Sequence, residues 1–268
     1  MKKVIFAAAV AAGMGAFALE SANVVGYNTT APLAADATAY AFTLVGLPFE
    51  SVGGNGNISL NDLQISNLTG ALSPTKSDQI WLWVADSEGN YNYETWRYRN
   101  AANGWLRMSD SAKFQEVYPN GIPAGTAFWF ASYNTSAEKT LTTSGAVAKE
   151  DTEVTLVRGQ FQFVSYPYPT NLKLNDSSVM DCSNCVGALS PTKSDQIWFW
   201  IADSEGNYNY ETWRYRNASN GWLRMSDSAK FQDVYPNGVP VGAGFWYSSY
   251  DNGASETYTI TFKSPITE

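Results

Sequence analysis

Alternating tryptophan and tyrosine residues are the part of this sequence best suited to chemistry. All ten tryptophans lie in two segments, 70–130 and 187–247, where aromatic rings alternate with Asn, Asp and Arg. A pyranose can stack its apolar face on such a ring while polar side chains reach its hydroxyls. The sequence therefore predicts a candidate glycan-binding platform in each segment, made of Trp81, Trp83, Tyr91, Tyr93 and Arg97 and of Trp198, Trp200, Tyr208, Tyr210 and Arg214.

The same rings have an ordinary structural interpretation, which we favour over binding. Burying one large aromatic side chain stabilises a fold by about 1.5 to 3 kcal/mol. Extended aromatic runs are also typical of strands that are covered on both faces. On this interpretation the rings fill the core between two sheets or the seam between two units. The exposure of the rings decides between the two interpretations.

Catalysis has little support in the sequence. The chain contains no histidine, which excludes Ser-His-Asp and Cys-His nucleophiles and every metal site that needs an imidazole. A glycoside hydrolase would need a pair of carboxylates, but no spacing marks a pair among Asp78, Asp86, Glu88, Glu94 and Asp110. The acidic turn at 86–90 lacks the spacing of a calcium loop. We expect no catalytic residue, no metal and no cofactor.

The two cysteines, Cys182 and Cys185, form a single Cys-Ser-Asn-Cys motif in the second half of the chain. A redox-active pair at this spacing is expected between a strand and a helix of a βαβ pattern, and no such pattern surrounds it. A local disulfide or an incidental thiol pair is therefore favoured over redox chemistry. Two sulfurs alone do not complete a zinc site.

The elements that position these residues are duplicated. Residues 70–130 return as residues 187–247 with 52 of 61 positions identical, and residues 42–49 match residues 161–168 more weakly. A long internal repeat indicates one structural unit built twice. We expect a first unit at 19–150, including an N-terminal strand, and a second at 151–268, joined through a short polar stretch rather than a long linker.

Within each unit the periodicity is that of β-structure. Short runs rich in aromatic and β-branched residues are separated by Gly, Asn and Pro, and in the first unit they fall at 79–85, 91–99, 105–108, 127–133 and 140–147. The fold class predicted is all-β, with two antiparallel sandwich-like or barrel-like units and little helix. Residues 109–115 have room for one helical turn, with Ser109 or Asp110 as its cap.

The hairpin at 86–90 allows a prediction of register. If Gly89 takes the left-handed position of a three-residue turn, Trp83 pairs with Tyr93 and Trp81 with Thr95. A two-residue turn would instead pair Trp81 with Trp96. In the first register the opposite face carries Ile80, Leu82 and Val84, and Glu94 is awkward if that face is core.

The N-terminal segment indicates export. Residues 1–18 contain Lys2 and Lys3, an apolar run and a small-residue cleavage site, as in a secretory signal peptide; an uncleaved anchor is the alternative. After cleavage 15 basic and 25 acidic residues remain, a charge of 15 − 25 = −10. This charge argues against nucleic acid as a partner, and we expect no membrane insertion after cleavage. The expected location is periplasmic, cell-surface or extracellular.

Several motifs together resemble an uncharacterised family of secreted bacterial proteins with tandem β-repeats. The motifs are Ser-Ala-Asn-Val-Val-Gly-Tyr at 21–27, the Phe-x-x-Val-x-x-Pro-aromatic strand, Ser-Asp-Gln-Ile-x-x-Trp, Pro-x-Gly-x-x-Phe-Trp at 123–129 and 240–246, and Ser-Gly-Ala-Val at 144–147. The resemblance implies secretion and an all-β architecture. It transfers no catalytic residue, and the Cys-x-x-Cys motif is not part of its pattern.

The sequence thus predicts a secreted, non-catalytic protein that acts as an extracellular structural or adhesive module. Self-association would use strand edges, including residues 23–27. The first alternative is a glycan-binding protein with two equivalent platforms, in which duplication would raise avidity for an extracellular polysaccharide. The second is a carboxylate-dependent glycoside hydrolase.

Overall fold

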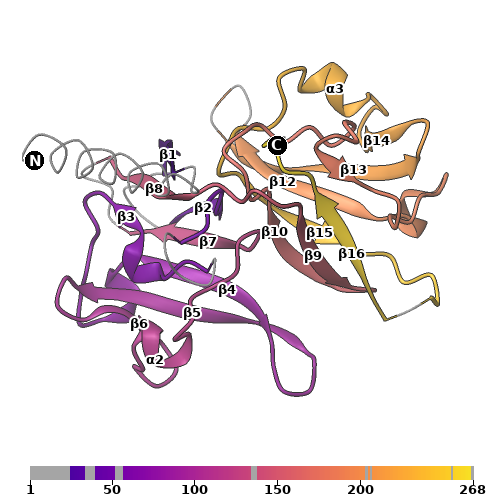
Figure 1. Ribbon diagram of the computed structural model, residues 1–268. Helices are drawn as coiled ribbons and strands as arrows, with labels where there is room; N and C mark the ends of the chain where they lie inside the picture. The colour runs from indigo at the N-terminus through magenta and orange to yellow at the C-terminus, as the bar shows by residue number, and fades with distance from the viewer. Residues whose placement is uncertain are drawn as a thin grey trace, which may run out of the picture.

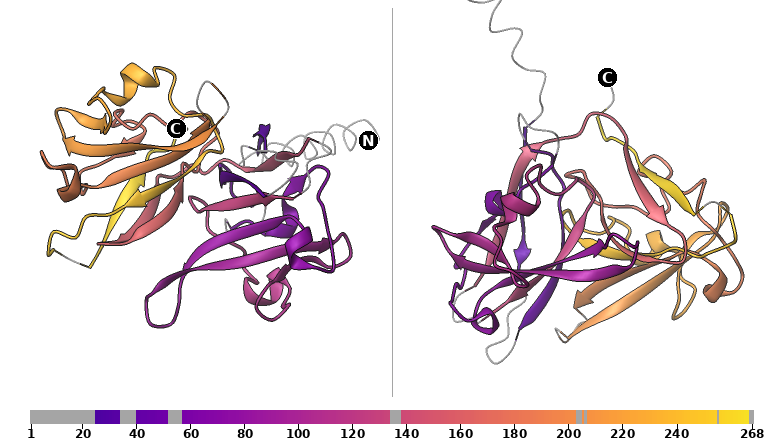
Figure 2. Two further views of the ribbon diagram at one scale, coloured as in Figure 1. Left: turned by 180° about the vertical axis from the view of Figure 1, so that it is seen from behind. Right: turned by 90° about the horizontal axis from the view of Figure 1, so that it is seen from below.

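The computed structural model describes residues 25–33, 40–51, 57–133, 138–202, 205, 207–254 and 256–266. The signal peptide expected at 1–18 lies outside these residues. Within them the chain forms antiparallel sheets arranged as two similar units side by side, and the all-β, sandwich-like prediction is confirmed (Figure 1). Two further directions show the same arrangement, with the indigo-to-magenta first unit beside the orange-to-yellow second unit (Figure 2).

The first unit contains a large sheet in the order β2-β7-β4-β5-β6 and a small sheet in the order β1-β8-β3. Short helical turns connect some of these strands. The strands are β1 (Val25–Pro32), β2 (Ala41–Gly46), β3 (Gln64–Ile65), β4 (Gln79–Ala85), β5 (Tyr91–Asn100), β6 (Gly104–Arg107), β7 (Ala127–Ser132) and β8 (Thr140–Ala146). The helical turns are η1 (Leu60–Asp62), η2 (Pro74–Lys76) and α2 (Phe114–Val117).

The second unit repeats this topology, with a large sheet in the order β10-β15-β12-β13-β14 and a small sheet in the order β11-β16-β9. Its strands are β9 (Thr152–Val157), β10 (Phe161–Ser165), β11 (Met180–Asp181), β12 (Gln196–Ala202), β13 (Tyr208–Asn217), β14 (Gly221–Arg224), β15 (Gly244–Ser248) and β16 (Thr257–Phe262), and its helical turns are η3 (Pro191–Lys193) and α3 (Phe231–Val234). β9 takes the place that β1 has in the first unit, so the repeat includes the first strand.

The predicted hairpin register is confirmed. Gly89 has a φ of 84°, and its N–H donates to the carbonyl of Asp86, closing the turn. Trp83 therefore pairs with Tyr93 and Trp81 with Thr95. The left-handed conformation at Gly89 is the one that glycine adopts without a steric cost.

The core of the first unit lies between its sheets, on the face of β4 that carries Ile80 and Leu82, and Phe128 of β7 and Leu141 of β8 complete it. The second unit has an equivalent core. Phe49, from the first unit, is fully buried in the core of the second. Burial of these apolar side chains is the main favourable contribution to the stability of each unit.

Glu94, on the core-facing side of β5, has the partners that its position requires. Its carboxylate accepts hydrogen bonds from Trp96 Nε1 at 3.0 Å and from the Tyr118 hydroxyl at 2.9 Å. Arg107 Nη1 lies 3.1 Å from it in an ion pair. A carboxylate satisfied in this way can lie next to an apolar core.

One expectation from the sequence is corrected. The helical turn is α2, which starts at Phe114 after Lys113, because Asp110 holds a tight turn by accepting from the backbone N–H of Ala112. Self-association through the edge at 23–27 stays a prediction, and Val25–Pro32 pairs with β8 along one side. Asn23 lies outside the described residues.

Candidate binding surface at the seam between the units

The two units meet where β2 and β7 face β10 and β15, at the centre of Figure 1. We call this contact region the seam. Gly46 N donates to the carbonyl of Gly242, and Ser165 N donates to the carbonyl of Gly125, both at 2.7 Å. Gly46 and Ser165 are equivalent in the repeat, as are Gly125 and Gly242. The seam is therefore built on an approximate twofold axis, as in a symmetric dimer.

Glycine permits the close backbone approach at this axis. A Cβ added to Gly46 would collide with the Cβ of Ser165, and one added to Gly244 would lie 2.6 Å from the Cβ of Ala127. Gly244 and Ala127 are equivalent positions of the two units. Each of these pairs across the axis thus combines one glycine with one small side chain.

Tryptophans at equivalent positions of the two units form hydrogen bonds and ring contacts across the seam. Trp83 Nε1 donates to the carbonyl of Phe161 at 2.7 Å, and Trp200 Nε1 donates to the carbonyl of Phe42 at 3.2 Å. Their rings also pack edge-to-face on tryptophans of the opposite unit. The centroid distances are 5.3 Å from Trp83 to Trp246 and 5.7 Å from Trp200 to Trp129. Such pairs contribute about 0.5 to 1.5 kcal/mol beyond area burial.

The structure brings the tryptophans of the two predicted platforms into one cluster. Half-buried Trp81, Trp83, Trp198 and Trp200 all pack against the apolar centre of the seam. The seam interpretation raised from the sequence thus accounts for these four rings, and the prediction that they bind a ligand stays a prediction. Phe42, Trp129, Phe161, Phe163 and Trp246, which the sequence argument did not select, complete the cluster. The internal repeat could have pointed to these residues, because each has an apolar counterpart 117 or 119 positions away in the other unit.

The predicted arginines have a structural role in each unit. Arg97 Nη1 donates to the carbonyls of Ala71 and Leu72 at 3.2 and 3.1 Å. Arg214 makes the equivalent bonds in the second unit, to Ala188 and Leu189. These bonds hold the loop that precedes the first strand of each hairpin, so both half-buried guanidinium groups have a structural role. The prediction that they bind a ligand stays a prediction.

The exposed part of the aromatic cluster forms a rim along the seam. We define the rim as the rings of Tyr93, Phe161, Tyr208 and Tyr210, whose residues are 43%, 39%, 38% and 42% exposed; Tyr91 is half-buried. Burial raises the pKa of Tyr93, with a smaller contribution from the neighbouring Tyr210 across the axis. Trp246 Nε1 donates to the Tyr210 hydroxyl at 3.1 Å. The Tyr93 ring lies 6.4 Å from the ring of Trp246 in the other unit, so the rings of the two predicted platforms lie close together across the axis.

The carboxylates considered for catalysis each have a structural partner, apart from the exposed Glu88. Asp86 accepts from the backbone N–H groups of Glu88 and Asn90 at 2.9 Å, which lowers its pKa. Asp110 binds Arg107. In the described part of the chain, no group of three or more His, Cys, Asp or Glu side chains could hold a metal ion. The second acidic turn includes Asp203, which lies outside that part.

Comparison with protein-family models, with curated proteins and with solved structures finds no match to this chain. Among the described residues there is no helix of the length and apolar character needed to span a bilayer. The argument for function therefore rests on the residues and geometry of the chain.

Proposed function

We propose that the chain is an exported protein that acts outside the cell as a structural or adhesive binding module, and that this binding role is non-catalytic. Export is supported by the basic and apolar character of residues 1–18. The observation that carries the proposal is the seam, where the aromatic residues of two duplicated units combine into a cluster with an exposed rim. A fixed, preorganised surface loses little conformational entropy when it binds a partner.

A glycan is the second candidate, and the rim supports it. Tyr93 and Tyr210 present partly exposed rings whose backs pack on tryptophan, with centroid distances of 4.7 Å from Tyr93 to Trp83 and 4.8 Å from Tyr210 to Trp200. Rings held in this way offer a rigid apolar face and a hydroxyl, the combination that a sugar ring requires. The two rings lie on opposite sides of the axis, which suits a chain of repeating sugars.

The experiment measures binding of the protein to a panel of soluble and insoluble polysaccharides. The double variant Tyr93→Ala/Tyr210→Ala removes both rings, and Tyr93→Phe/Tyr210→Phe is the matched control that keeps them. We expect the alanine variant to bind at least tenfold more weakly, about 1.4 kcal/mol, and the phenylalanine variant to retain most of the affinity.

Equal binding by the wild type and the alanine variant would reject the rim as the site. If the wild type binds no polysaccharide in the panel, the glycan candidate is rejected. Light scattering of the wild type over a concentration series then tests the structural role. A protein that stays monomeric at every concentration would contradict self-association.

A further inference from the structure

The two units differ most clearly in chemistry around one buried aspartate. In the first unit, Asp78 forms an ion pair with Lys139 Nζ at 2.6 Å, and their side chains are 0% and 2% exposed. Asp78 also accepts from the backbone N–H groups of Thr69 and Tyr133, both at 2.7 Å. A buried carboxylate is stabilised by a cation and hydrogen bonds of this kind. The equivalent residue of the second unit is Asp195.

In the second unit the cation is replaced by hydroxyl groups. Tyr258 stands at the position of Lys139, and Tyr247 at the position of Phe130. Both hydroxyls donate to the Oδ2 atom of Asp195 at 2.9 Å. Asp195 is 0% exposed. Tyrosine hydroxyls supply hydrogen bonds but no positive charge, so the carboxylate of the second unit is buried without a neighbouring ammonium group.

The cysteines lie next to this altered aspartate. Cys182 and Cys185 stand at the positions of Ile65 and Leu68, and both are free thiols in the structure. The backbone N–H of Cys185 donates to the carbonyl of Cys182 at 3.0 Å, so the two cysteines share one tight turn. The Cys185 sulfur lies 3.4 Å from the hydroxyl oxygen of Tyr247.

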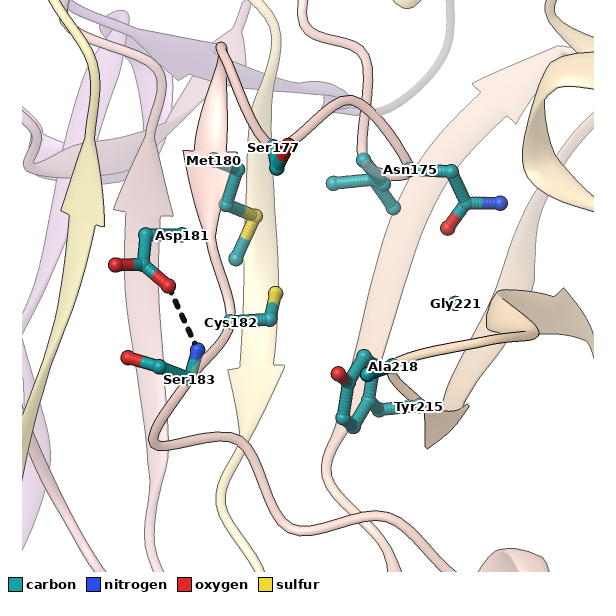
Figure 3. Close-up of a pocket in the computed structure, with 10 residues that line it drawn as sticks. Asn175, Ser177, Met180, Asp181, Cys182, Ser183, Tyr215, Ala218 and Gly221 are labelled. Carbon is teal, nitrogen blue, oxygen red and sulfur yellow. Dashed lines mark hydrogen bonds between the residues drawn. The ribbon is translucent and has the colours of Figure 1, made fainter.

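Cys182 also has a donor and access from the surface. Trp222 Nε1 donates to the Cys182 sulfur at 3.3 Å. Cys182 lines a pocket of about 240 Å³. Figure 3 shows Cys182 and Met180 on one wall of this pocket, with Tyr215 and Asn175 on the opposite wall. A thiol with an N–H donor and an adjacent pocket is placed to react with a small molecule.

We propose that Cys182 and Cys185 are a redox-active dithiol, in which Cys182 exchanges with a disulfide entering the pocket and Cys185 resolves the mixed disulfide. The substrate is a low-molecular-weight disulfide or an extended peptide disulfide, since the pocket is small. The second unit differs from the first at four positions around its buried aspartate. These differences link the Cys182 thiol to the Asp195 carboxylate through Cys185 and Tyr247. This activity is independent of binding at the rim.

The thiol–disulfide exchange consists of two successive displacements at sulfur. Cys182 loses its proton to solvent, and its thiolate attacks one sulfur of the substrate, forming a mixed disulfide and releasing the first substrate thiolate, which takes up a proton from solvent. Cys185 then loses its proton through the Tyr247 hydroxyl to Asp195, and its thiolate attacks the Cys182 sulfur. The second substrate thiol leaves with that proton. Overall the dithiol is oxidised to a disulfide by two electrons and the substrate disulfide is reduced to two thiols.

The groups around Cys185 explain why it needs a proton acceptor. Burial, together with the neighbouring Cys182, raises the pKa of the Cys185 thiol well above its usual value. The other titratable or charged groups facing the site are Asp181, which lines the pocket beside Cys182, Tyr215 of β13, Tyr247 of β15, Tyr258 of β16 with Arg158 stacked 4.0 Å above its ring, and Asp195. Because Cys185 ionises poorly, transfer of its proton to Asp195 would speed the second displacement.

The first test treats the protein with dithiothreitol, removes the reductant, and adds oxidised glutathione as the probe. We expect rapid closure to an intramolecular disulfide with release of two glutathione thiols. Cys185→Ser is expected to stop at a mixed disulfide on Cys182, and Cys182→Ser to react at least tenfold more slowly than wild type. A wild-type pair that excess dithiothreitol does not reduce, or reaction of the two serine variants at equal rates, would overturn the proposal.

The second test examines the proton relay, the transfer of the Cys185 proton through the Tyr247 hydroxyl to Asp195. Tyr247→Phe introduces the residue that the first unit has at this position, so the fold is expected to tolerate it, and Phe130→Tyr in the first unit is the matched control. We expect Tyr247→Phe to slow closure of the mixed disulfide by about tenfold near neutral pH. The difference should disappear at a pH high enough to ionise Cys185 directly. Equal closure rates at every pH would reject the relay.

Discussion

At the scale of single residues, glycines determine which surfaces of the two units can meet. Gly46 faces Ser165 and Gly244 faces Ala127 across the axis, and the members of each pair are equivalent in the repeat. A first unit meeting a copy of itself would set Ala127 against Ala127, and a second unit would set Ser165 against Ser165. Both contacts place two Cβ atoms in a space that holds one. The substitutions between copies therefore favour pairing of unlike units.

The contact between Gly244 and Ala127 predicts that a substitution at one position lowers stability and that a second substitution at the other position compensates. Gly244→Ala is expected to lower the free energy of unfolding by about 1 to 3 kcal/mol, because the new Cβ would lie 2.6 Å from the Ala127 Cβ and 2.9 Å from the Val45 carbonyl oxygen. Urea denaturation followed by tryptophan fluorescence measures the loss. Ala127→Gly in the same chain should recover part of it, because the close approach to the Val45 carbonyl remains. No recovery in the double variant would contradict the proposed contact across the axis.

The buried aspartate of the second unit predicts a dependence of stability on pH. Burial raises the pKa of Asp195 in the folded chain above its ordinary value, which is about 3.9. The folded state therefore binds this proton more tightly than the unfolded state does, so the contribution of Asp195 to stability is largest below pH 4. It is lost as the pH rises through the folded pKa.

Urea midpoints of wild type and Asp195→Asn across this pH range measure the effect. The stability of the wild type relative to the variant should fall as the pH rises. Asp86→Asn is the control of opposite sign, because hydrogen bonds from backbone N–H groups, that of Asn90 foremost, lower the pKa of Asp86. Its stabilising effect should be present above pH 4 and be lost on acidification. The same pH trend for both variants would contradict the assignment.

At the scale of elements, the hairpins of β4–β5 and β12–β13 serve two purposes, since one face covers a core and the other closes the seam. The sequence allowed the first purpose to be predicted, because alternation and the Gly89 turn determine the register and hence which side chains share a face. It could not identify what covers the other face. That depends on contacts such as Gly46 with Gly242, between residues distant in the chain and set by the packing of whole units.

The cysteine cluster was hidden from the sequence for the same reason. Cys182, Tyr247 and Asp195 lie on different elements, and their proximity follows from the pairing of β11 with β16 and of β12 with β15. Only an alignment of the two copies in three dimensions shows that Tyr258 replaces Lys139, because the shift between copies changes from 117 to 119 along the chain.

The hairpin of the first unit predicts a specific effect of one hydrogen bond. Trp83→Phe keeps an aromatic ring but removes the donor to the carbonyl of Phe161 in β10, so we expect the free energy of unfolding to fall by about 1 kcal/mol and amide exchange in β10 to become faster. Trp81→Phe is the matched control, because Trp81 Nε1 donates to Gln79 within its own strand. Hydrogen exchange read by mass spectrometry distinguishes them. Equal exchange in β10 for both variants would contradict a bond between units.

At the scale of the whole molecule, two units with separate cores are held by the seam, by the connection between β8 and β9, and by Phe49, which reaches from the first unit into the second core. Ala148, at the end of the first unit, is also buried in that core. The units are therefore expected to behave as one body rather than as modules that swing on a linker. This rigidity keeps the rings of the rim on the two sides of the axis at a constant separation.

The strength of the seam can be measured by cutting the chain. Lys149 and Glu150 are exposed between β8 and β9, so a protease site inserted between them opens the connection after folding. The intact connection holds each unit at an effective concentration on the order of millimolar relative to the other. After the cut, the two pieces stay together only through their non-covalent contacts. The two pieces should still elute together in size exclusion at micromolar concentration, because the contacts across the axis and Phe49 remain. The same cut in Gly244→Ala should release them, whereas separation of the wild-type pieces would show that the connection alone joins the units.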